Sequence, residues 1–135
     1  MRGVDFAPRM VERAQAKAHR HRVDARFEVG DAAAPTTDGR VDVVLARHVL
    51  WALPDPAAAL DRWVDLLGGH SLLVLIEGLW ATGAGLRAAD LLPLVQSRTT
   101  STSVVDLTPM TPLWRAAVTD ERYLVCGSVH APASA

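Results

Sequence analysis

The residues best suited to chemistry follow an apolar run near the middle of the sequence. Arg47 and His48 come directly after the run 41–46, and Trp51 lies three residues further on. An imidazole titrates near neutral pH, so His48 is a candidate general base, whereas Arg47 is interpreted as a structural or ligand-facing cation. Open α/β sheets bind ligands at the carboxyl ends of central strands, so the sequence predicts its main site here.

Other candidate residues end short apolar segments, and each has a plain structural alternative. Asp5 either binds a ligand or sits near the start of a helix dipole. Asp31 either binds a ligand or shapes a turn. Glu77 either steers an amine or hydroxyl group or caps the next turn, and Trp80 either closes over a substrate or packs on the sheet. The residues alone leave these alternatives open.

Composition excludes several classes of protein. The chain has 135 residues, half of them apolar, and a net charge of −1, which gives no electrostatic attraction to nucleic acid or to a membrane. One cysteine, Cys126, excludes an internal disulfide and a cysteine-rich metal site, and the five histidines lack the spacing of metal ligands. Without a signal peptide or an apolar span, the sequence predicts one cytoplasmic domain over residues 1–135.

Strands and helices alternate in the hydrophobic pattern. The expected strands are residues 3–6, 25–29, 41–46, 71–77, 103–107 and 121–130, and the expected helices are residues 8–20, 56–67 and 86–98. Asp55 and Pro56 supply an N-cap and a first helical residue, while Gly68 and Gly69 are expected to end that helix. The alternation predicts a mainly parallel sheet with helices on its faces.

Three details of this pattern bear on function. The first helix carries a basic stripe, which we interpret as a solvated outer face because no aromatic residues are interleaved with it. The run 41–46 is β-branched and aliphatic apart from Asp42, so it is expected to be a buried parallel strand. The glycines at 78, 83 and 85 predict a loop flexible enough to act as a lid.

With these segments identified, the chain resembles the class I S-adenosylmethionine-dependent methyltransferases of the methyltransferase domain 11 type. The motifs that carry the resemblance are the segments 3–10, 27–32, 41–56 and 68–78. The resemblance covers nearly the whole chain, from the family's second strand to its last. It implies a Rossmann-like α/β sheet with helices on both faces and transfer of a methyl group from S-adenosyl-L-methionine to a small-molecule acceptor.

The resemblance also implies roles for individual residues. Asp5, with Phe6 beside it, stands where the family binds the ribose hydroxyls of the cofactor, a task that suits a carboxylate because it accepts two hydrogen bonds at once. Asp31 and Ala32 stand where the family binds adenine. Arg47 and His48 line the cavity for cofactor and acceptor, and His48 is the candidate catalytic residue. No metal is implied.

The sequence departs from the family in two places. It contains neither the family's first strand nor a Gly-rich loop, which in the family lies against the methionine part of the cofactor. The position before Pro8, usually a hydroxyl cap, is Ala7, at a cost of about 1 kcal/mol in helix capping. The missing strand implies a slot between the strands containing Val4 and Val41, with two unpaired apolar edges.

Three interpretations of the missing strand remain open: a misplaced start, a truncated relic, or a slot filled by a partner. We expect residues 1–135 to bind the cofactor weakly or not at all. The alternative function is a non-catalytic fragment that serves as an interaction module, self-associating through its open sheet edges. A nicotinamide dehydrogenase half is a third hypothesis, which would use Asp5 but not Asp31.

Overall fold

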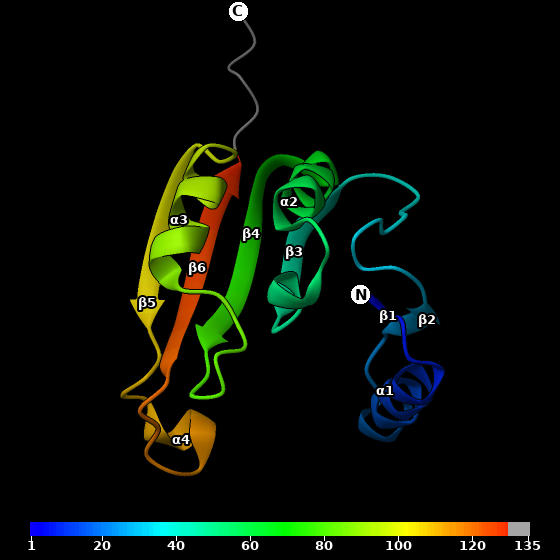
Figure 1. The fold of residues 1–135 in the computed structure, drawn as a ribbon. Helices are drawn as coiled ribbons and strands as arrows, with labels where there is room; N and C mark the ends of the chain where they lie inside the picture. Colours follow the sequence, from blue (N-terminus) through cyan, green and yellow to red (C-terminus); the bar gives the residue numbers. More distant parts are fainter. Residues whose placement is uncertain (130–135) are drawn as a thin grey trace, which may run out of the picture. The chain divides into compact units, whose positions relative to one another are not determined.

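The computed structural model describes residues 1–129 and divides the chain into two compact units, Met1–Thr36 and Thr37–Ala135. Each unit contains its own sheet (Figure 1). The first unit contains β1 (Arg2–Asp5), α1 (Pro8–His21) and β2 (Arg26–Val29). The second contains β3 (Val41–Arg47), η1 (Leu50–Ala52), α2 (Pro56–Asp65), β4 (Leu67–Leu79), α3 (Ala88–Gln96), β5 (Ser101–Asp106), α4 (Thr111–Trp114) and β6 (Glu121–Val129). The predicted order of strands and helices is confirmed, with the short helices η1 and α4 added. His130, expected in the last strand, lies outside the described residues.

In the first unit, β1 and β2 form a two-stranded parallel sheet, with Asp5 paired to Val29. The two strands approach closely because Gly3 has no side chain: a Cβ there would lie 2.6 Å from the ring of Phe27. Helix α1 begins at Pro8 with no side-chain cap, as Ala7 predicts. The unit therefore places the carboxyl ends of two parallel strands at one edge, where β1 ends at Asp5 and Asp31 follows β2.

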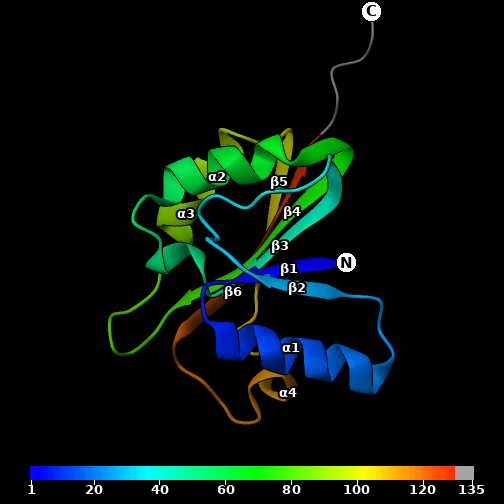
Figure 2. The same cartoon turned by 90° about the vertical axis from the view of Figure 1, so that its right-hand side faces the viewer.

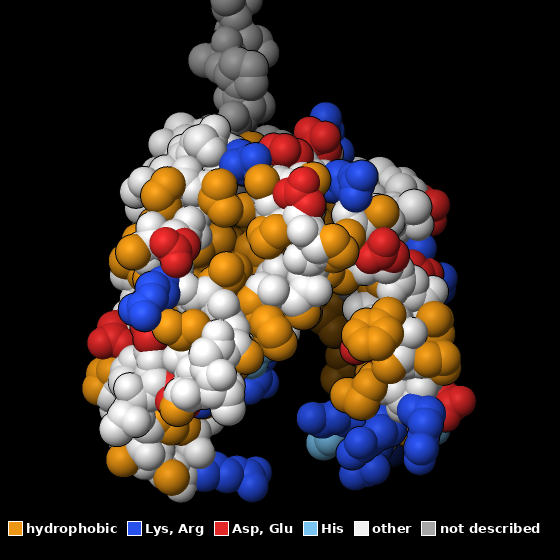
Figure 3. All heavy atoms as spheres, in the orientation of Figure 1, with side chains coloured by type: hydrophobic (Ala, Val, Ile, Leu, Met, Phe, Trp, Pro, Cys, Tyr) orange, Lys and Arg blue, Asp and Glu red, His pale blue; other side chains and the backbone are white. Residues whose placement is uncertain are grey.

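The basic stripe of α1 is exposed, as the sequence predicts. Figure 3 shows blue Lys and Arg side chains gathered over α1, and the exposed basic residues of the helix include Arg9, Arg13, Lys17 and Arg20. Only Val11 is buried in this helix. The stripe is thus a solvated face, and no aromatic side chain lies among these arginines and lysine along the helix.

The second unit is built on a four-stranded mixed sheet in the order β3-β4-β6-β5. Strands β3 and β4 are parallel, whereas β6 runs antiparallel to both β4 and β5. Helices α2 and α3 lie on the same face of this sheet (Figure 2). The core between them is fully apolar apart from Ser71 and Glu77, and consists mainly of Leu60, Trp63, Leu73, Leu75, Leu91, Val95, Tyr123 and Val125.

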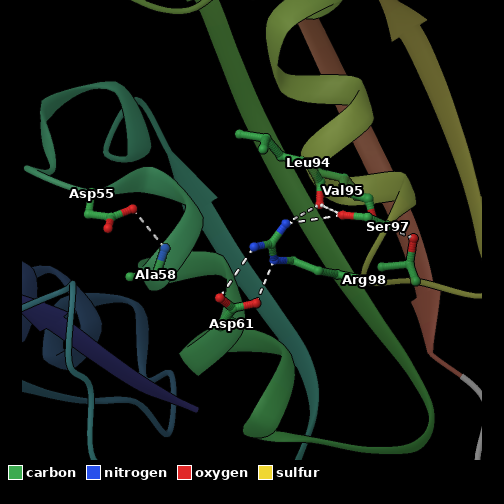
Figure 4. A network of polar contacts seen from close by, with 8 residues as sticks. Asp55, Ala58, Asp61, Leu94, Val95, Ser97 and Arg98 are labelled. Carbon is green, nitrogen blue, oxygen red and sulfur yellow. Dashed lines mark hydrogen bonds and ion pairs between the residues drawn. The ribbon is translucent and has the colours of Figure 1, made fainter.

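Helix α2 is fixed at its start and along its outer side. The Asp55 carboxylate accepts a hydrogen bond from the Ala58 amide at 2.9 Å, which confirms the predicted cap (Figure 4). Arg98, after α3, donates to both carboxylate oxygens of Asp61 at 2.7 and 3.2 Å. The hydrogen bond from Arg98 lowers the pKa of Asp61. These contacts hold α2 against α3 and the sheet.

Several boundaries differ from the sequence prediction. Helix α2 ends at Asp65, and the predicted stop signal, Gly68 and Gly69, lies inside β4. Glycine satisfies the criteria for a helix end and also tolerates a strand, so sequence alone did not separate the two outcomes. His70 follows in β4 with a φ of 65°. Strand β4 begins at Leu67, pairs from there with Val41, and shows a register shift between Val41 and Val43.

Strand β3 is buried on one face only, contrary to the prediction. Ala46 packs in the core, whereas Val43 and Leu45 are 51% and 63% exposed. The run of aliphatic residues looked like a doubly buried strand, yet helices α2 and α3 cover a single face of the sheet. Among the described residues, β3 pairs only with β4, so its other edge has no strand partner. β1 likewise pairs only with β2.

The segment after β4 is a hydrogen-bonded turn rather than a loose lid. The Trp80 amide donates to Ala84 O, the Gly83 amide donates to Trp80 O, and Leu79 bridges to Gly85. Gly83 and Gly85 have positive φ angles, which explains why glycine is used there. Cys126 is half-buried in β6. Among residues 1–129, no helix combines the length and apolar character needed to cross a bilayer.

Candidate functional site

The structure contains two groups of candidate residues, one in each unit. The first lies at the carboxyl ends of β1 and β2 and includes Asp5 and Asp31. The second surrounds His48, at the carboxyl end of β3. No cluster of three or more metal-ligating residues occurs in the described part of the chain.

Both carboxylates of the first unit are fixed by tight turns. Asp5 Oδ1 accepts a hydrogen bond from the Ala7 amide at 2.8 Å, and Asp31 Oδ1 accepts one from the Ala33 amide at 2.8 Å. Asp5 is half-buried, while Asp31 is exposed, and in each carboxylate this contact uses only Oδ1. Each aspartate is therefore held in one rotamer and keeps acceptor capacity for a donor such as a hydroxyl group.

A shallow hollow of about 200 Å³ lies beside Asp31 in the same unit. Its lining includes Val4, Glu28, Gly30 and Asp31. Gly30 helps to keep this surface open, since a Cβ there would lie 3.0 Å from Val4 Cγ1. Asp5 does not line the hollow. Phe6, expected beside the cofactor, is 84% exposed and packs against little else.

The second group is organised by a turn at the end of β3. His48 has a φ of 53°, a left-handed conformation uncommon for a residue with a side chain. Its amide donates to Ile76 O at 2.9 Å, which ties the turn to β4. This geometry projects the imidazole toward Trp80, whose ring centre lies 4.9 Å away at an interplanar angle of 63°.

Glu77 holds the same turn from the core side. Its side chain is fully buried, and Oε1 accepts hydrogen bonds from the Val49 amide at 3.1 Å and the Leu50 amide at 2.9 Å. Burial raises the pKa of Glu77, and the two backbone hydrogen bonds oppose that shift. Glu77 was expected either to steer an amine or hydroxyl group or to cap the next turn. The structure supports a capping role, but the turn that Glu77 caps follows β3 and not β4, the strand that contains Glu77.

Aromatic and cationic side chains surround His48. Trp51 contacts Trp80 edge-on, with ring centres 5.8 Å apart. The Arg122 guanidinium lies 5.8 Å from the centre of the Trp80 ring and 4.7 Å from that of Trp114. The sequence identified Trp51 and Trp80 as candidates; it did not indicate Arg122, which reaches the cluster because the start of β6 pairs with the end of β4.

The protonation state of His48 follows from these surroundings. Burial, and then the positive charges of Arg47 and Arg122, lower the pKa of His48 below its ordinary value of 6.5. The imidazole is therefore neutral at pH 7 and has one nitrogen able to accept a proton. Its Nδ1 is buried without a hydrogen-bond partner among the described residues. A neutral imidazole beside aromatic rings is suited to general-base chemistry.

Comparison with known proteins identifies the family. A family profile described as methyltransferase domain matches residues 1–75, which is more than half of the chain. The chain belongs to this methyltransferase family. The matched part includes Asp5, Asp31, Arg47 and His48 and ends near the end of the β4 core. No curated protein matches the chain significantly.

Solved structures show that this methyltransferase domain has the class I fold. The cyclase SpnF superimposes with a TM-score of 0.78 at 15% identity, covering 97% of this chain and 67% of SpnF. The N-methyltransferase NodS from Bradyrhizobium japonicum, in complex with S-adenosyl-L-homocysteine, superimposes with a TM-score of 0.75 at 21% identity, covering 95% of this chain and 65% of NodS.

A third similar structure is magnesium protoporphyrin IX methyltransferase from Synechocystis PCC 6803 with bound S-adenosylmethionine. Its TM-score is 0.67 at 20% identity, with 93% of this chain and 58% of that protein covered. The methyltransferase chain thus spans about two thirds, or less, of the length of these proteins. At such identities the similarity establishes the fold, which in SpnF belongs to a cyclase.

Proposed function

We propose that the chain is an S-adenosylmethionine-dependent methyltransferase that acts on a small-molecule acceptor. The observation that carries the proposal is the turn at the end of β3, where a neutral His48 is held at positive φ beside aromatic rings. Family membership supplies the reaction class. The acceptor class follows from the surroundings of His48.

The residues of the first unit suit the adenosine part of the cofactor. Asp5 and Asp31 follow neighbouring parallel strands, and each is fixed by a turn that engages Oδ1. Carboxylate oxygens accept hydrogen bonds from ribose hydroxyls and from an exocyclic amine, so these two residues would hold the nucleoside. The exposed Phe6 and the segment at Ala32 would lie beside it. When bound, S-adenosylmethionine supplies a methyl group activated as a sulfonium.

In this proposal the second unit binds the acceptor and manages its proton. Trp51 and Trp80 contact the acceptor, and Arg47 orients it. The two aspartates of the first unit would hold the cofactor, which would supply the methyl group to the acceptor atom that Arg47 and the tryptophans position. His48 takes the proton that the acceptor atom loses. Methyl transfer depends mainly on alignment, so His48 contributes a modest share of the rate, about 10²–10⁴-fold.

Titration with S-adenosyl-L-homocysteine tests the proposal. Because the sequence contains no Gly-rich loop, we expect residues 1–135 to bind with a Kd weaker than about 10 μM, equivalent to less than about 7 kcal/mol. Asp5→Asn should weaken binding further, whereas Glu12→Gln, a charge-matched change on the exposed side of α1 and away from the hollow, should not. Absence of any binding at millimolar ligand, or equal binding by both variants, would contradict the assignment of Asp5.

A second candidate function rests on the open edge of β3. Val43 and Leu45 are exposed, and β3 pairs only with β4 among the described residues. Such an edge is a template for pairing with another chain, here a second copy. Light scattering of the chain over a concentration series tests self-association. A Leu45→Lys variant should remove it, and a monomer at all concentrations would rule this candidate out.

A further inference from the structure

The cluster around His48 has a composition that selects among methyl acceptors. Its aromatic part consists of Trp51, Trp80 and Trp114, and its basic part consists of Arg47 and Arg122. All of these residues belong to the second unit. Trp51 is 39% exposed, so part of the aromatic surface is open to a ligand. Rigid aromatic rings bind planar apolar groups at little conformational cost.

The rings of Trp80 and Trp114 already bind a cation of the protein itself, the Arg122 guanidinium. Arg122 lies over both Trp80 and Trp114, and its guanidinium is held by Asp120 at 2.9 Å. Asp120 also accepts from the Ala81 amide at 3.0 Å, so both of its oxygens are engaged. A cationic ligand at Trp80 would therefore meet the Arg122 charge instead of an empty aromatic surface.

Arg47 adds a second positive charge that has no protein partner. It is exposed and directly precedes His48, and no hydrogen bond or ion pair joins its side chain to another described residue. Glu77, which follows the strand partner of Arg47, is buried in the core, where Oε1 is bonded to two amides and Oε2 is buried. Glu121, at the start of β6, accepts from the Ala88 amide at 2.9 Å.

We propose that the cluster of Arg47, His48, Trp51 and Trp80 binds a planar aromatic acceptor that carries a carboxylate in addition to the protonated hydroxyl group that receives the methyl group. The ring lies against the tryptophans, and Arg47 pairs with the oxyanion, for which its forked guanidinium is well suited. An amine acceptor that is protonated in solution is disfavoured by both arginines. This inference rests on the proposed methyl transfer, because only that function makes the bound aromatic compound a methyl acceptor.

Three probes of nearly the same size and shape test the charge preference directly. Benzoate is anionic, benzamide is neutral and benzamidine is cationic at pH 7. We expect the chain to bind them in that order of decreasing affinity, measured by ligand-observed NMR or calorimetry, with benzoate at least about threefold tighter than benzamide. Equal or tighter binding of benzamidine, or no binding of benzoate at millimolar concentration, would overturn the proposal.

Variants separate the contributions of charge and ring. Arg47→Gln should reduce benzoate affinity by about three- to tenfold and leave benzamide unchanged, because an exposed pair contributes modestly. Arg87→Gln, the same charge change at an exposed residue that contacts no ring of the cluster, is the matched control. Trp80→Leu should weaken all three probes. If Arg47→Gln and Arg87→Gln affect benzoate equally, Arg47 is not the anion contact and the proposal fails.

The same samples distinguish this inference from the proposed function. Titration with S-adenosyl-L-homocysteine reports on the cofactor independently of the aromatic probes. Binding of benzoate with the expected order, together with no binding of the cofactor analogue, would contradict methyl transfer and retain the anion site. Binding of the analogue with no preference among the probes would support methyl transfer and contradict the anion site.

Discussion

Glu77 should be the residue on which the conformation of the His48 turn depends most. In the Glu77→Ala variant, the amides of Val49 and Leu50 lose their acceptor. Leu50 is fully buried, so water cannot readily replace the carboxylate. An unsatisfied buried donor costs about 1–3 kcal/mol, and partial relaxation at Val49 reduces the sum, so we expect the free energy of unfolding to fall by about 2–4 kcal/mol.

Amide hydrogen exchange locates this effect, and Glu77→Gln is the matched control. In Glu77→Ala the Val49 and Leu50 amides should exchange at least about tenfold faster than in the wild type, since about 1.4 kcal/mol corresponds to a factor of ten. Glutamine keeps an acceptor oxygen, so it should preserve protection of both amides. Unchanged exchange in the alanine variant would refute the capping role.

For the wild type and Glu77→Gln, we expect stabilities that depend differently on pH. Burial raises the folded-state pKa of Glu77 above its ordinary value of 4.5. The folded state then binds more protons than the unfolded state above pH 4.5, so the contribution of Glu77 to stability is complete below this pH and is lost as pH rises through the folded-state pKa. Glutamine cannot titrate. In urea titrations from pH 4 to 8, Glu77→Gln should therefore gain stability relative to the wild type as pH rises, and a constant difference would show that Glu77 is not responsible.

Three further substitutions test the fold that supports the site. Asp55→Ala removes the acceptor for the Ala58 amide and should lower the free energy of unfolding by about 1 kcal/mol in urea titration, and an unchanged midpoint would refute the cap. Trp63→Ala empties a core position that is 3% exposed and should cost about 3–5 kcal/mol in the same assay, with a loss under 1 kcal/mol arguing against the described core. In Gly78→Ala the new Cβ would clash with the carbonyl of Glu121, so we expect loss of β4–β6 pairing, seen as reduced strand content in circular dichroism, and a native spectrum would contradict the close approach of these strands.

The order of elements was predictable because each helix and strand carries a strong local signal. The aliphatic run 41–46 and the Asp55–Pro56 cap predicted a strand and a helix start, and both are present. Local signals do not report what covers a strand, however. The exposure of Val43 and Leu45 depends on helices α2 and α3 sharing one face, a tertiary property that the hydrophobic pattern of β3 does not contain.

The candidate site was predicted where its residues are close in sequence and missed where they are not. Arg47, His48 and Trp51 lie on one segment, so strand-end reasoning found them together. Arg122 joins them from β6, about 75 residues later, because β4 and β6 pair in antiparallel register. The sequence predicted a strand over residues 121–130 in a mainly parallel sheet, but it did not indicate the antiparallel pairing with β4 that brings Arg122 to the site.

The backbone conformation at His48 lowers the stability of the fold, whereas the imidazole at this position serves the proposed reaction. A left-handed φ costs a residue with a side chain about 1–2 kcal/mol, whereas asparagine and glycine tolerate it far better. A library randomised at this codon and sorted only for heat resistance should therefore drift toward asparagine or glycine. The same library sorted for turnover should retain the imidazole. Residue 48 would then be a position at which selection for function maintains a less stable protein.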